Sequence, residues 1–519
     1  MAHAAPLWRK SRDSSNVLAL HERLLATLPS LSSALGTAGW LGVVATAAHI
    51  AIIFVVGVRV LSTRRAPGSA AAWLLLAVVL PYAGALLYLL IGERPLGRRR
   101  ARHAEAMLPR VDQWVRALAE RLRGVPSALP EQWRPIRRLA DSGIGTPALP
   151  GNRLTLLSGA QDILRAIIAD VETARQFCAL EFYIWNAGGT ADEVGEALMR
   201  AAARGVTCRV LLDAVGSAAF FKTAWPGRLR AAGVELHAAL PAGILRAAFR
   251  RVDLRLHRKI VVVDGQVAYT GSLNLVDPRC FKQDAGVGQW VDAMVRVEGP
   301  LVEGLGALFA WDWSLETGAR LPALIGPVGA PLETSAGSAV VQMVPSGPGF
   351  QTPTILQLLV AAVYAAREEL FITTPYFVPD EALVLALRTA AQRGVRVRLI
   401  VPAKVDSLLV RHASRAYYDE LLDAGVEILL FDAGLLHTKC MVVDRELAFF
   451  GTLNLDLRSF LLNFEVTLLA YDPVFADAVA KLAGSYADQA ERLDPAAWKR
   501  RPASQRLTEN LAQIMSPLL

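Results

Sequence analysis

Two long uncharged runs dominate the hydrophobic pattern near the beginning of the chain. Residues 34–58 contain a single histidine and no formal charge, and residues 69–92 contain no ionisable group except two tyrosines. Each run is longer than the roughly 20 apolar residues that a helix needs to cross the hydrocarbon core of a bilayer. Because only residues 59–68 separate them, the pattern predicts a hairpin of two transmembrane helices.

The alternatives for this region are a cleavable signal peptide and a pair of buried core helices. A signal peptide fits poorly because the first run begins after 33 residues and a second spanning run follows it. Pro81, inside the second run, is tolerated more easily in a membrane helix than in a soluble one. We therefore expect membrane helices here.

Arginines on either side of the hairpin predict its orientation. Six basic residues flank the outer ends of the two helices, and three lie in the turn between them. The outer set is Arg23, Arg94, Arg98, Arg99, Arg100 and Arg102, and the turn holds Arg59, Arg64 and Arg65. Because cytoplasmic loops carry the excess of basic residues, both termini and everything after residue 92 are expected on the cytoplasmic side.

The remainder of the chain repeats itself. The segment RGVTCRVLLDAVGS (204–217) matches RGVRVRLIVPAKVDS (393–407), and each half continues from a β-rich run, at 179–185 or 369–377, into an amphipathic helix. Strands that alternate with helices indicate an α/β fold with a largely parallel sheet. Two copies predict a two-lobed body with an approximate twofold axis. A site between the lobes would then receive one contribution from each.

Changes in composition along the chain give the expected domain boundaries. A charged helical pattern and a proline-rich tether precede the first half, and a segment rich in Gly, Pro, Ala and Ser separates the halves. The expected parts are an N-terminal tail (1–33), two transmembrane helices (34–92), a linker (93–150), lobe 1 (151–317), a second linker (318–339), lobe 2 (340–494) and a C-terminal tail (495–519).

Composition excludes several classes of protein. Apolar residues make up 53% of the 519 residues and charged residues 20%, with a mean hydropathy of +0.34, so the chain is not largely disordered. Its four cysteines form no Cys-x-x-Cys pair, which argues against a disulfide framework and a cysteine-based zinc site. The 55 basic and 47 acidic residues give a net charge of +8. That charge suits nucleic acid, anionic lipid or a solvated surface, and does not choose among them.

One repeated motif carries the candidate chemistry. HRKIVVVD (257–264) and HTKCMVVD (437–444) share the pattern His-x-Lys-x4-Asp, at equivalent places in the repeat. Two such occurrences lie far outside the rate at which a short motif matches by chance. The match continues downstream with a hydroxyl, an amide and a carboxylate in each half: Ser272, Asn274 and Asp292 in the first, and Thr452, Asn454 and Glu465 in the second.

Each motif is expected to lie on a buried strand, because the stretch after its histidine is apolar and β-branched. Residues i and i+2 of a strand point to the same face, so the histidine and lysine of each motif project together. Asp264 and Gly265 predict a turn into a second strand, which brings Ser272 and Asn274 back beside the first pair. Cys440 lies on the opposite strand face in the second motif and is expected to pack in the core.

This constellation suits phosphoryl transfer. One histidine attacks phosphorus and the other protonates the leaving oxygen, while lysines and amides hold the phosphate oxygens. No metal or other cofactor is expected, because two lysines neutralise the charge that a metal would otherwise cover. A metal site built from the two histidines is the weaker alternative, since the lysines repel a cation and the spacing is not that of common zinc sites.

The doubled motif resembles the HKD motifs of the phospholipase D superfamily, and with the N-terminal hairpin the chain is similar to bacterial cardiolipin synthases. The resemblance runs from residue 34 to about residue 494 and includes the strings AWLLLAVVLPYAGALLYLLIGE (72–93), NLVDPRCFKQDAGVGQW (274–290), ITTPYFVPDEAL (372–383) and FGTLNLDLRS (450–459). It implies two phospholipase D-like α-β-α lobes preceded by a transmembrane helical hairpin. It also implies a multi-pass protein of the bacterial inner membrane, with both lobes on the cytoplasmic side.

The resemblance further implies a reaction. One histidine forms a phosphatidyl-histidine from phosphatidylglycerol, and the other acts as acid on the departing glycerol. The second histidine then deprotonates a hydroxyl of another phosphatidylglycerol, which takes the phosphatidyl group to give cardiolipin. Carried over by position, the roles are catalytic for His257, Lys259, His437 and Lys439, phosphate-binding for Ser272, Asn274, Thr452 and Asn454, and histidine-orienting for Asp292 and Glu465.

Three assignments stay open at this point. Analogy with other two-motif members makes His257 the expected nucleophile, although the symmetry of the sequence does not settle the choice. Asp264 and Asp444 complete the catalytic motif but sit at strand ends, where a structural role is the alternative. The arginine-rich segment 244–259 is either a membrane-surface element that gathers anionic headgroups or a solvated loop.

Three rival functions also remain. A phospholipase D that passes the phosphatidyl group to water shares the covalent intermediate, so the motifs do not separate it from a transferase. A nuclease of the same superfamily has no evident need of two spanning helices, and no nucleic acid partner is expected. A membrane scaffold with a decayed site would require that His257→Ala and His437→Ala leave function intact.

Overall fold

The computed structural model describes most of the chain, which divides into two compact units, Met1–Glu93 and Arg94–Leu519. The described residues are 39–62, 67–80, 82–88, 92, 98–122, 129–241, 253–319, 336–348 and 354–514. The expected N-terminal tail, most of the expected linker 318–339 and the arginine-rich residues 242–252 lie outside them.

The first unit contains a helix, Gly39–Ser62, that is long and apolar enough to cross a membrane. Only 6% of its most apolar stretch is buried within the protein. Large side chains such as Leu41, Phe54 and Leu61 are therefore exposed around the helix. A helix that is apolar on all sides and is not covered by protein is typical of a membrane span.

The second apolar run does not form the single helix that its pattern predicts. It is divided into α2 (Pro67–Val79) and α3 (Ala83–Leu87), and Tyr82 between them has a φ of +60°. The division falls next to Pro81, which itself lies outside the described residues; proline removes a helical hydrogen bond and clashes with the preceding turn. The two arms nevertheless pack together, and the Tyr82 hydroxyl donates to the Ala45 carbonyl at 2.7 Å.

The second unit is built on one sheet of sixteen strands, in which two similar halves meet at the antiparallel pair β1–β10. The strand order is β20-β14-β13-β11-β16-β17-β19-β10-β1-β9-β7-β6-β2-β3-β4, and β5 pairs with β19. The first half contains β1 (Leu149–Ser158), β2 (Phe177–Phe182), β3 (Thr207–Asp213), β4 (Glu235–Ala239), β5 (Arg255–Leu256), β6 (Ile260–Val263), β7 (Val267–Gly271), β8 (Trp290–Val291) and β9 (Ala293–Glu298). The second half contains β10 (Ala339–Ser346), β11 (Glu369–Thr373), β12 (Phe377–Val378), β13 (Arg396–Pro402), β14 (Glu427–Phe431), β15 (Leu435–Leu436), β16 (Cys440–Val443), β17 (Leu447–Gly451), β18 (Leu455–Asp456), β19 (Asn463–Ala470) and β20 (Ala490–Arg492).

Strand direction changes within each half at the motif strand. The outer strands β2, β3 and β4 run parallel, as do β11, β13 and β14 in the other half. The motif strands β6 and β16 pair antiparallel with β2 and β11, and each turns back into an antiparallel partner, β7 or β17. The sheet is mixed, and the prediction of a largely parallel sheet is wrong, because each motif ends in a tight hairpin instead of a helical crossover.

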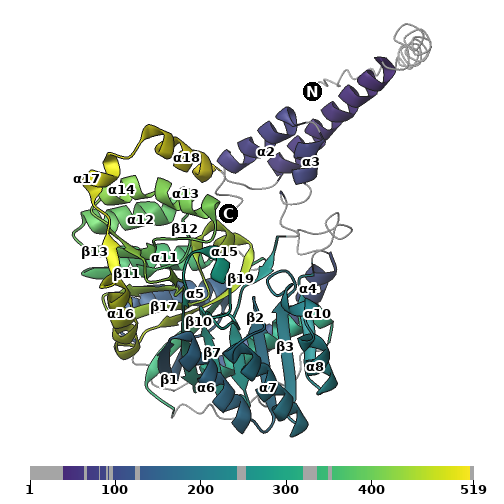
Figure 1. The fold of residues 1–519 in the computed structure, drawn as a ribbon, viewed down its shortest axis with the longest axis vertical. Coiled ribbons are helices and arrows are strands. Elements are labelled where there is room, and N and C mark those ends of the chain that lie inside the picture. The colour runs from purple at the N-terminus through teal and green to yellow at the C-terminus, as the bar shows by residue number, and fades with distance from the viewer. Residues whose placement is uncertain are drawn as a thin grey trace, which may run out of the picture. The chain divides into compact units, whose positions relative to one another are not determined.

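Helices cover both faces of the sheet, which gives each half the α-β-α layering that was predicted. Figure 1 shows one group of helices over the teal strands of the first half and another over the green strands of the second. The first group is α6 (Ala160–Thr173), α7 (Thr190–Ala203) and α8 (Trp225–Ala231), and the second is α11 (Thr354–Ala365), α12 (Glu381–Gln392), α13 (Leu408–Ala416) and α14 (Tyr418–Asp423). The other face carries α10 (Leu301–Thr317) and α16 (Pro473–Ala487).

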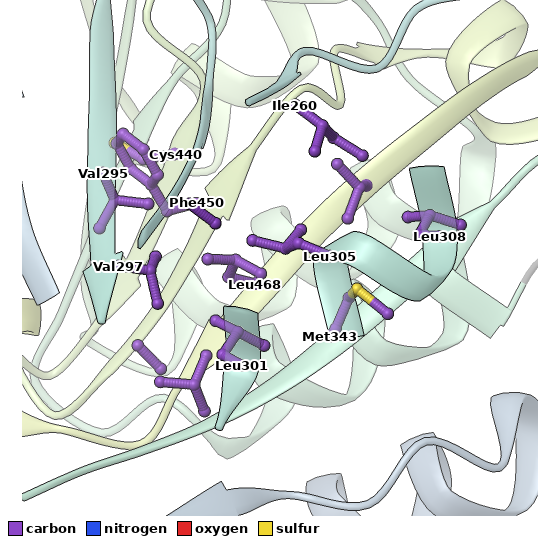
Figure 2. Close-up of a cluster of buried hydrophobic side chains, with 14 of the residues drawn as sticks. Ile260, Val295, Val297, Leu301, Leu305, Leu308, Met343, Cys440, Phe450 and Leu468 are labelled. Carbon is purple, nitrogen blue, oxygen red and sulfur yellow. The ribbon is translucent and has the colours of Figure 1, made fainter. Parts of the chain in front are cut away.

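The two halves share one hydrophobic core on the α10 and α16 side of the sheet. In Figure 2, Leu305 of α10 and Met343 of β10 lie in the same cluster as Leu468 of β19 and Val295 of β9. Cys440 is buried in this cluster, as predicted. Because both halves contribute side chains to one core, the groups at their junction are held in a fixed relation to each other.

Segments outside the repeat also contain packed helices. These are α4 (Arg98–Arg121) and α5 (Arg134–Ile144) before the first half, α15 (Leu457–Leu461) inside the second, and α17 (Pro495–Lys499) and α18 (Ala503–Ile514) after it. Ile136 and Ala140 of α5 are buried in the core of the second half, and α18 packs against α13. The described residues of the expected linker 93–150 and of the expected tail 495–519 therefore contribute to the folded body.

Candidate active site

Each motif histidine lies on the connection into its motif strand, with its backbone bonded to the opposite half. His257 lies between β5 and β6, and its amide donates to the Phe464 carbonyl at 2.9 Å. His437 lies between β15 and β16, and its amide donates to the Val291 carbonyl at 2.8 Å. The short strands leading to them also pair across the junction, β5 with β19 and β15 with β8. The fold thus brings the two motifs together.

Carboxylates from the opposite half hold the imidazoles. His257 Nδ1 lies 2.8 Å from both carboxylate oxygens of Glu465, and His437 Nδ1 lies 2.6 Å from Asp292 Oδ1. An ionised carboxylate only accepts hydrogen bonds, so each Nδ1 carries the proton and each Nε2 keeps a free lone pair. The sequence pattern predicted these carboxylates, but it did not predict their exchange between the halves.

The predicted phosphate-binding hydroxyls are bonded to these carboxylates. Ser272 donates to Asp292 Oδ1 at 2.6 Å and accepts from the Ala293 amide, and Thr452 donates to Glu465 Oε2 at 2.6 Å. Thr452 also accepts from the amide that follows Glu465. Both hydroxyls are buried in these networks, so their contacts are with the orienting carboxylates and not with an open phosphate position.

The two amides have different surroundings. Asn274 Oδ1 accepts from the Ile184 amide at 3.2 Å, whereas Asn454 Oδ1 is buried with no hydrogen-bond partner among the described residues. A buried polar atom without a partner is rare in a folded protein, and a bound ligand can supply the missing partner. Because Oδ1 only accepts, a hydroxyl of the substrate is the partner that it suits, and a contact of Asn454 with a phosphate oxygen has to come from its Nδ2 group.

Both motif lysines are buried, each next to the histidine of its own motif. Lys259 Nζ donates to the His257 carbonyl and Lys439 Nζ to the His437 carbonyl, both at 2.7 Å. Burial lowers the pKa of Lys259 to about 8, and burial together with the charge of Lys259 lowers the pKa of Lys439 to about 7. Two ammonium groups that repel each other in a buried site favour the binding of an anion between them.

The imidazoles are neutral at physiological pH. Burial, which outweighs the attraction of the carboxylates, lowers the pKa of both His257 and His437 to about 4. Burial also opposes ionisation of Asp292 and Glu465, but the hydrogen-bonded histidines and the motif lysines hold the pKa of both carboxyls below the usual range. The resting site consequently combines two neutral bases with two ionised carboxylates.

The motif aspartates lie away from this cluster. The Asp264 carboxylate accepts from three backbone amides, those of residues 175, 176 and 177, at 2.8–2.9 Å. The Asp444 carboxylate accepts from the amides of residues 367, 368 and 369 at 2.8–2.9 Å. Both residues have positive φ in the turn after the motif strand. These bonds fasten the hairpin to the neighbouring strand, which corresponds to the structural alternative for the two aspartates.

At Arg258 the structure contradicts the expectation that segment 244–259 lies at a membrane surface or in a solvated loop. Its side chain is fully buried, with Nε donating to the Glu465 carbonyl at 3.0 Å and another nitrogen paired with Asp312 of α10. The alternation that puts His257 and Lys259 on one strand face puts Arg258 on the other. That alternation was the signal by which the sequence could have identified it as an internal anchor.

Two aromatic rings beside the histidines were not predicted. The Tyr183 ring meets His257 edge-on with 5.1 Å between ring centroids, and the Trp290 ring lies 4.3 Å from His437. Both rings contribute to the burial that keeps the imidazoles neutral. Among the described residues, no group of three or more His, Cys, Asp and Glu side chains is placed to hold a metal ion.

Comparisons with known proteins show the family to which the chain belongs. A family model described as "Cardiolipin synthase, PLD-like domain" matches residues 167–313 and 359–486, and one described as "Phospholipase_D-nuclease N-terminal" matches residues 50–93. Cardiolipin synthase A of Yersinia pseudotuberculosis serotype O:1b and that of Yersinia pestis bv. Antiqua (strain Angola) are each 48% identical to the chain over 467 residues. Each alignment covers 89% of this chain and 96% of the relative.

A solved structure shows a similar fold at lower identity. The crystal structure of phosphatidylserine synthase from Haemophilus influenzae Rd KW20 aligns with a TM-score of 0.55 and 14% identity, over 74% of this chain and 100% of that one. The family matches cover both motifs and residues 50–93 of the N-terminal apolar region. The chain belongs to the cardiolipin synthase family of the phospholipase D superfamily.

Proposed function

We propose that this membrane enzyme makes cardiolipin and glycerol from two molecules of phosphatidylglycerol, through a phosphatidyl-histidine intermediate. The observation that carries the proposal is the pair of neutral imidazoles, each held at Nδ1 by a carboxylate of the opposite half, beside two buried lysines. A nucleophile, an acid and two cations around one position are the groups that transfer of a phosphodiester requires.

In the donor step, His257 Nε2 attacks the phosphorus of phosphatidylglycerol and the bond to the glycerol oxygen breaks. His437 donates its Nε2 proton to that oxygen, so glycerol leaves as a neutral molecule. Glu465 stabilises the positive charge that develops on His257. Lys259 and Lys439 stabilise the negative charge on the equatorial oxygens, and the Asn274 and Asn454 amides complete the contacts with phosphate.

The protonation states of this step follow from substrate binding. A pKa of about 4 keeps His257 neutral and nucleophilic in the empty site, but His437 has to carry a second proton to act as an acid. The negative charge of a bound phosphodiester raises the pKa of an adjacent imidazole. Binding of the donor therefore supplies the condition under which His437 takes up its proton.

In the acceptor step the roles of His437 reverse. Its neutral Nε2 takes the proton of a glycerol hydroxyl on a second phosphatidylglycerol, and that oxygen attacks the phosphorus. The His257–phosphorus bond breaks and His257 becomes neutral again. When cardiolipin leaves, the pKa of His437 falls back to about 4, so His437 releases the proton that it took from the acceptor to solvent. The exclusion of water by the buried surroundings of both histidines favours a lipid alcohol over hydrolysis.

The other site residues act through the histidines in this scheme. Ser272 and Thr452 orient the carboxylates of Asp292 and Glu465, and those carboxylates fix the tautomer of each histidine. Asp264 and Asp444 fasten the motif hairpins. The enzyme is assigned to the bacterial cytoplasmic membrane as a multi-pass protein with its lobes on the cytoplasmic side, which is supported by the arginines that flank the apolar runs.

The test is mass spectrometry of the lipids formed when the purified full-length protein meets phosphatidylglycerol in mixed micelles containing EDTA. Cardiolipin and free glycerol are expected in equal amounts, and His437→Ala should abolish both. His237→Ala, which changes an exposed histidine outside the site, serves as the matched control and should keep full activity. Phosphatidic acid as the sole product would identify a hydrolase, and no turnover of any phospholipid would contradict the lipid substrate.

A further inference from the structure

The apolar side of helix α18 faces away from the protein. Leu507, Leu511 and Ile514 are 62%, 56% and 76% exposed. Their spacing of four and three residues places them on one face of the helix. These three side chains, called the α18 stripe below, are not covered by any of the described residues.

The opposite side of α18 is polar, and it is the side that packs on the second half. Glu509 is fully buried, accepts from Arg501 Nε at 2.9 Å and pairs with Arg415 of α13 at 3.2 Å. Ala512 is the other buried residue of the helix. A helix on a protein surface normally buries its apolar face and exposes its polar one. In α18 this arrangement is reversed, so the exposed leucines are not left over from an incomplete core.

Exposed apolar residues elsewhere in the second half are scattered. Leu385 on α12 and Val474 on α16 are 56% and 79% exposed, each as a single large apolar side chain on its helix. Isolated exposures of this kind are normal on protein surfaces, whereas several on one face indicate an interaction site. Leu408, 70% exposed, begins α13, the helix against which α18 packs.

The sequence around the α18 stripe is basic. Residues 495–508 contain no acidic residue and four basic ones, Lys499, Arg500, Arg501 and Arg506. Arg501 is taken up by Glu509 and Asp419, while Arg500 and Arg506 are exposed. An exposed apolar face flanked by arginines is the composition of helices that lie in the interface of an anionic bilayer.

We propose that α18 is a membrane-docking helix, with the α18 stripe in the boundary between headgroups and acyl chains and Arg500 and Arg506 on anionic headgroups. The partner is a phospholipid bilayer because the helix Gly39–Ser62 already attaches the chain to one, and because the charge around the stripe is complementary to anionic lipid. Docking would hold the catalytic unit on the surface that contains its substrate. This role rests on the proposed function only for the location of that substrate.

The direct test measures the depth of α18 in full-length protein reconstituted into vesicles of phosphatidylglycerol and phosphatidylcholine. In a Cys280→Ser background, which removes the exposed cysteine, Leu511→Cys carries an environment-sensitive fluorophore. Val474→Cys is the matched control, an exposed apolar position on α16, which Figure 1 shows well apart from α18. A lipid-borne nitroxide should quench the label at position 511 at least threefold more than the label at 474, and aqueous iodide should show the reverse order.

Three results would overturn the proposal. Quenching of the 511 label by iodide and not by lipid would show that the stripe faces water. Self-quenching that grows with the amount of labelled protein per vesicle would show that a second copy covers it. Protection from both quenchers would show that another segment of this chain covers it. None of these readouts depends on catalysis, so they stay separate from a failure of the proposed function.

A second measurement tests the consequence for activity. The triple variant Leu507→Ser, Leu511→Ser, Ile514→Ser should lose about fivefold or more of its rate on phosphatidylglycerol vesicles, because interfacial binding scales with buried apolar area. On mixed micelles of the same lipid its rate should stay within a factor of two of the unchanged protein. Val474→Ser should leave both rates unchanged. An equal loss on vesicles and micelles, or no loss on either, would contradict a docking role.

Discussion

Behind the first motif lies an ionic cluster, whereas the contacts that the structure describes behind the second motif are between neutral groups. Arg258 reaches the Glu465 carbonyl and Asp312, and the buried Glu181 lies in the same cluster. At the equivalent place in the second half, Thr438 donates to the Val291 carbonyl at 3.2 Å and meets the Tyr486 hydroxyl at 3.1 Å. In both halves the middle residue of the motif bonds to the backbone of the opposite half, at or next to the carboxylate that orients the histidine of the same motif.

The comparison shows that the same pairing of histidine and carboxylate is backed by an ionic network in the first half and by neutral hydrogen bonds in the second. Burial raises the pKa of Glu181 well above its usual range, and the charge of the nearby Asp312 adds to this effect. Arg258 and Asp312 then form a buried ion pair, which is costly to break but not necessarily more stabilising than a neutral contact. Each histidine is therefore held by a carboxylate in the same way in both halves, while the groups one layer behind the histidines differ.

The largest expected effect concerns the histidines themselves. Either His257→Ala or His437→Ala should lower the rate of cardiolipin formation by roughly 10⁴-fold or more, because the two imidazoles act as one unit. With His257 as nucleophile, the His437→Ala protein should still accumulate phosphatidyl-enzyme on a phosphatidylglycerol analogue with a good leaving group. The His257→Ala protein should accumulate none, as measured by mass spectrometry of peptides. The opposite pattern would assign the attack to His437.

The second-largest loss of activity should follow substitution of the orienting carboxylates. Glu465→Gln and Asp292→Asn each remove the charge that fixes the Nδ1 proton, and a loss of about 10³–10⁴-fold in kcat is expected for each. Because KM reports the contacts with lipid, it should change little. An effect on one variant that exceeds the other by more than tenfold would mean that the two halves are not chemically equivalent.

Much of this site could be predicted from sequence because the repeat doubles every informative residue. The histidines, lysines, amides and carboxylates were found in that way. The pairing of each carboxylate with the histidine of the opposite half could not be predicted, because a repeat shows that two copies exist but not which carboxylate lies next to which histidine. That relation depends on the antiparallel β1–β10 pair at the centre of the sheet. The break of the second apolar run beside Pro81 was likewise hidden, because hydropathy reports length but not helix continuity.

Substitution of the residue between His and Lys in each motif should show how much the ionic cluster behind the first motif and the neutral contacts behind the second each contribute to stability. Arg258→Met leaves Asp312 buried without its cation, so the free energy of unfolding should fall by about 3–5 kcal/mol. Thr438→Val removes only hydroxyl hydrogen bonds and should cost about 1 kcal/mol. Thermal unfolding in detergent, followed by tryptophan fluorescence, measures both changes. Adding Asp312→Asn to Arg258→Met should recover part of the loss; if it deepens the loss, the ionic cluster is not the cause.

The smallest expected effect is a difference in proton uptake between the motif lysines. With pKa values of about 8 for Lys259 and about 7 for Lys439, both ammonium groups are mostly neutral at pH 8.5 in the empty site. A bound anion raises both pKa values, so binding of dimethyl phosphate at pH 8.5 should take up between one and two protons through the two lysines, about one of them through Lys439. Calorimetry in buffers of different ionisation enthalpy measures this number. At pH 8.5 the number of protons taken up should fall more in Lys439→Met than in Lys259→Met. At pH 6 both lysines are already charged, so neither substitution should change proton uptake. Equal decreases at pH 8.5 would contradict an electrostatic difference between the two motifs.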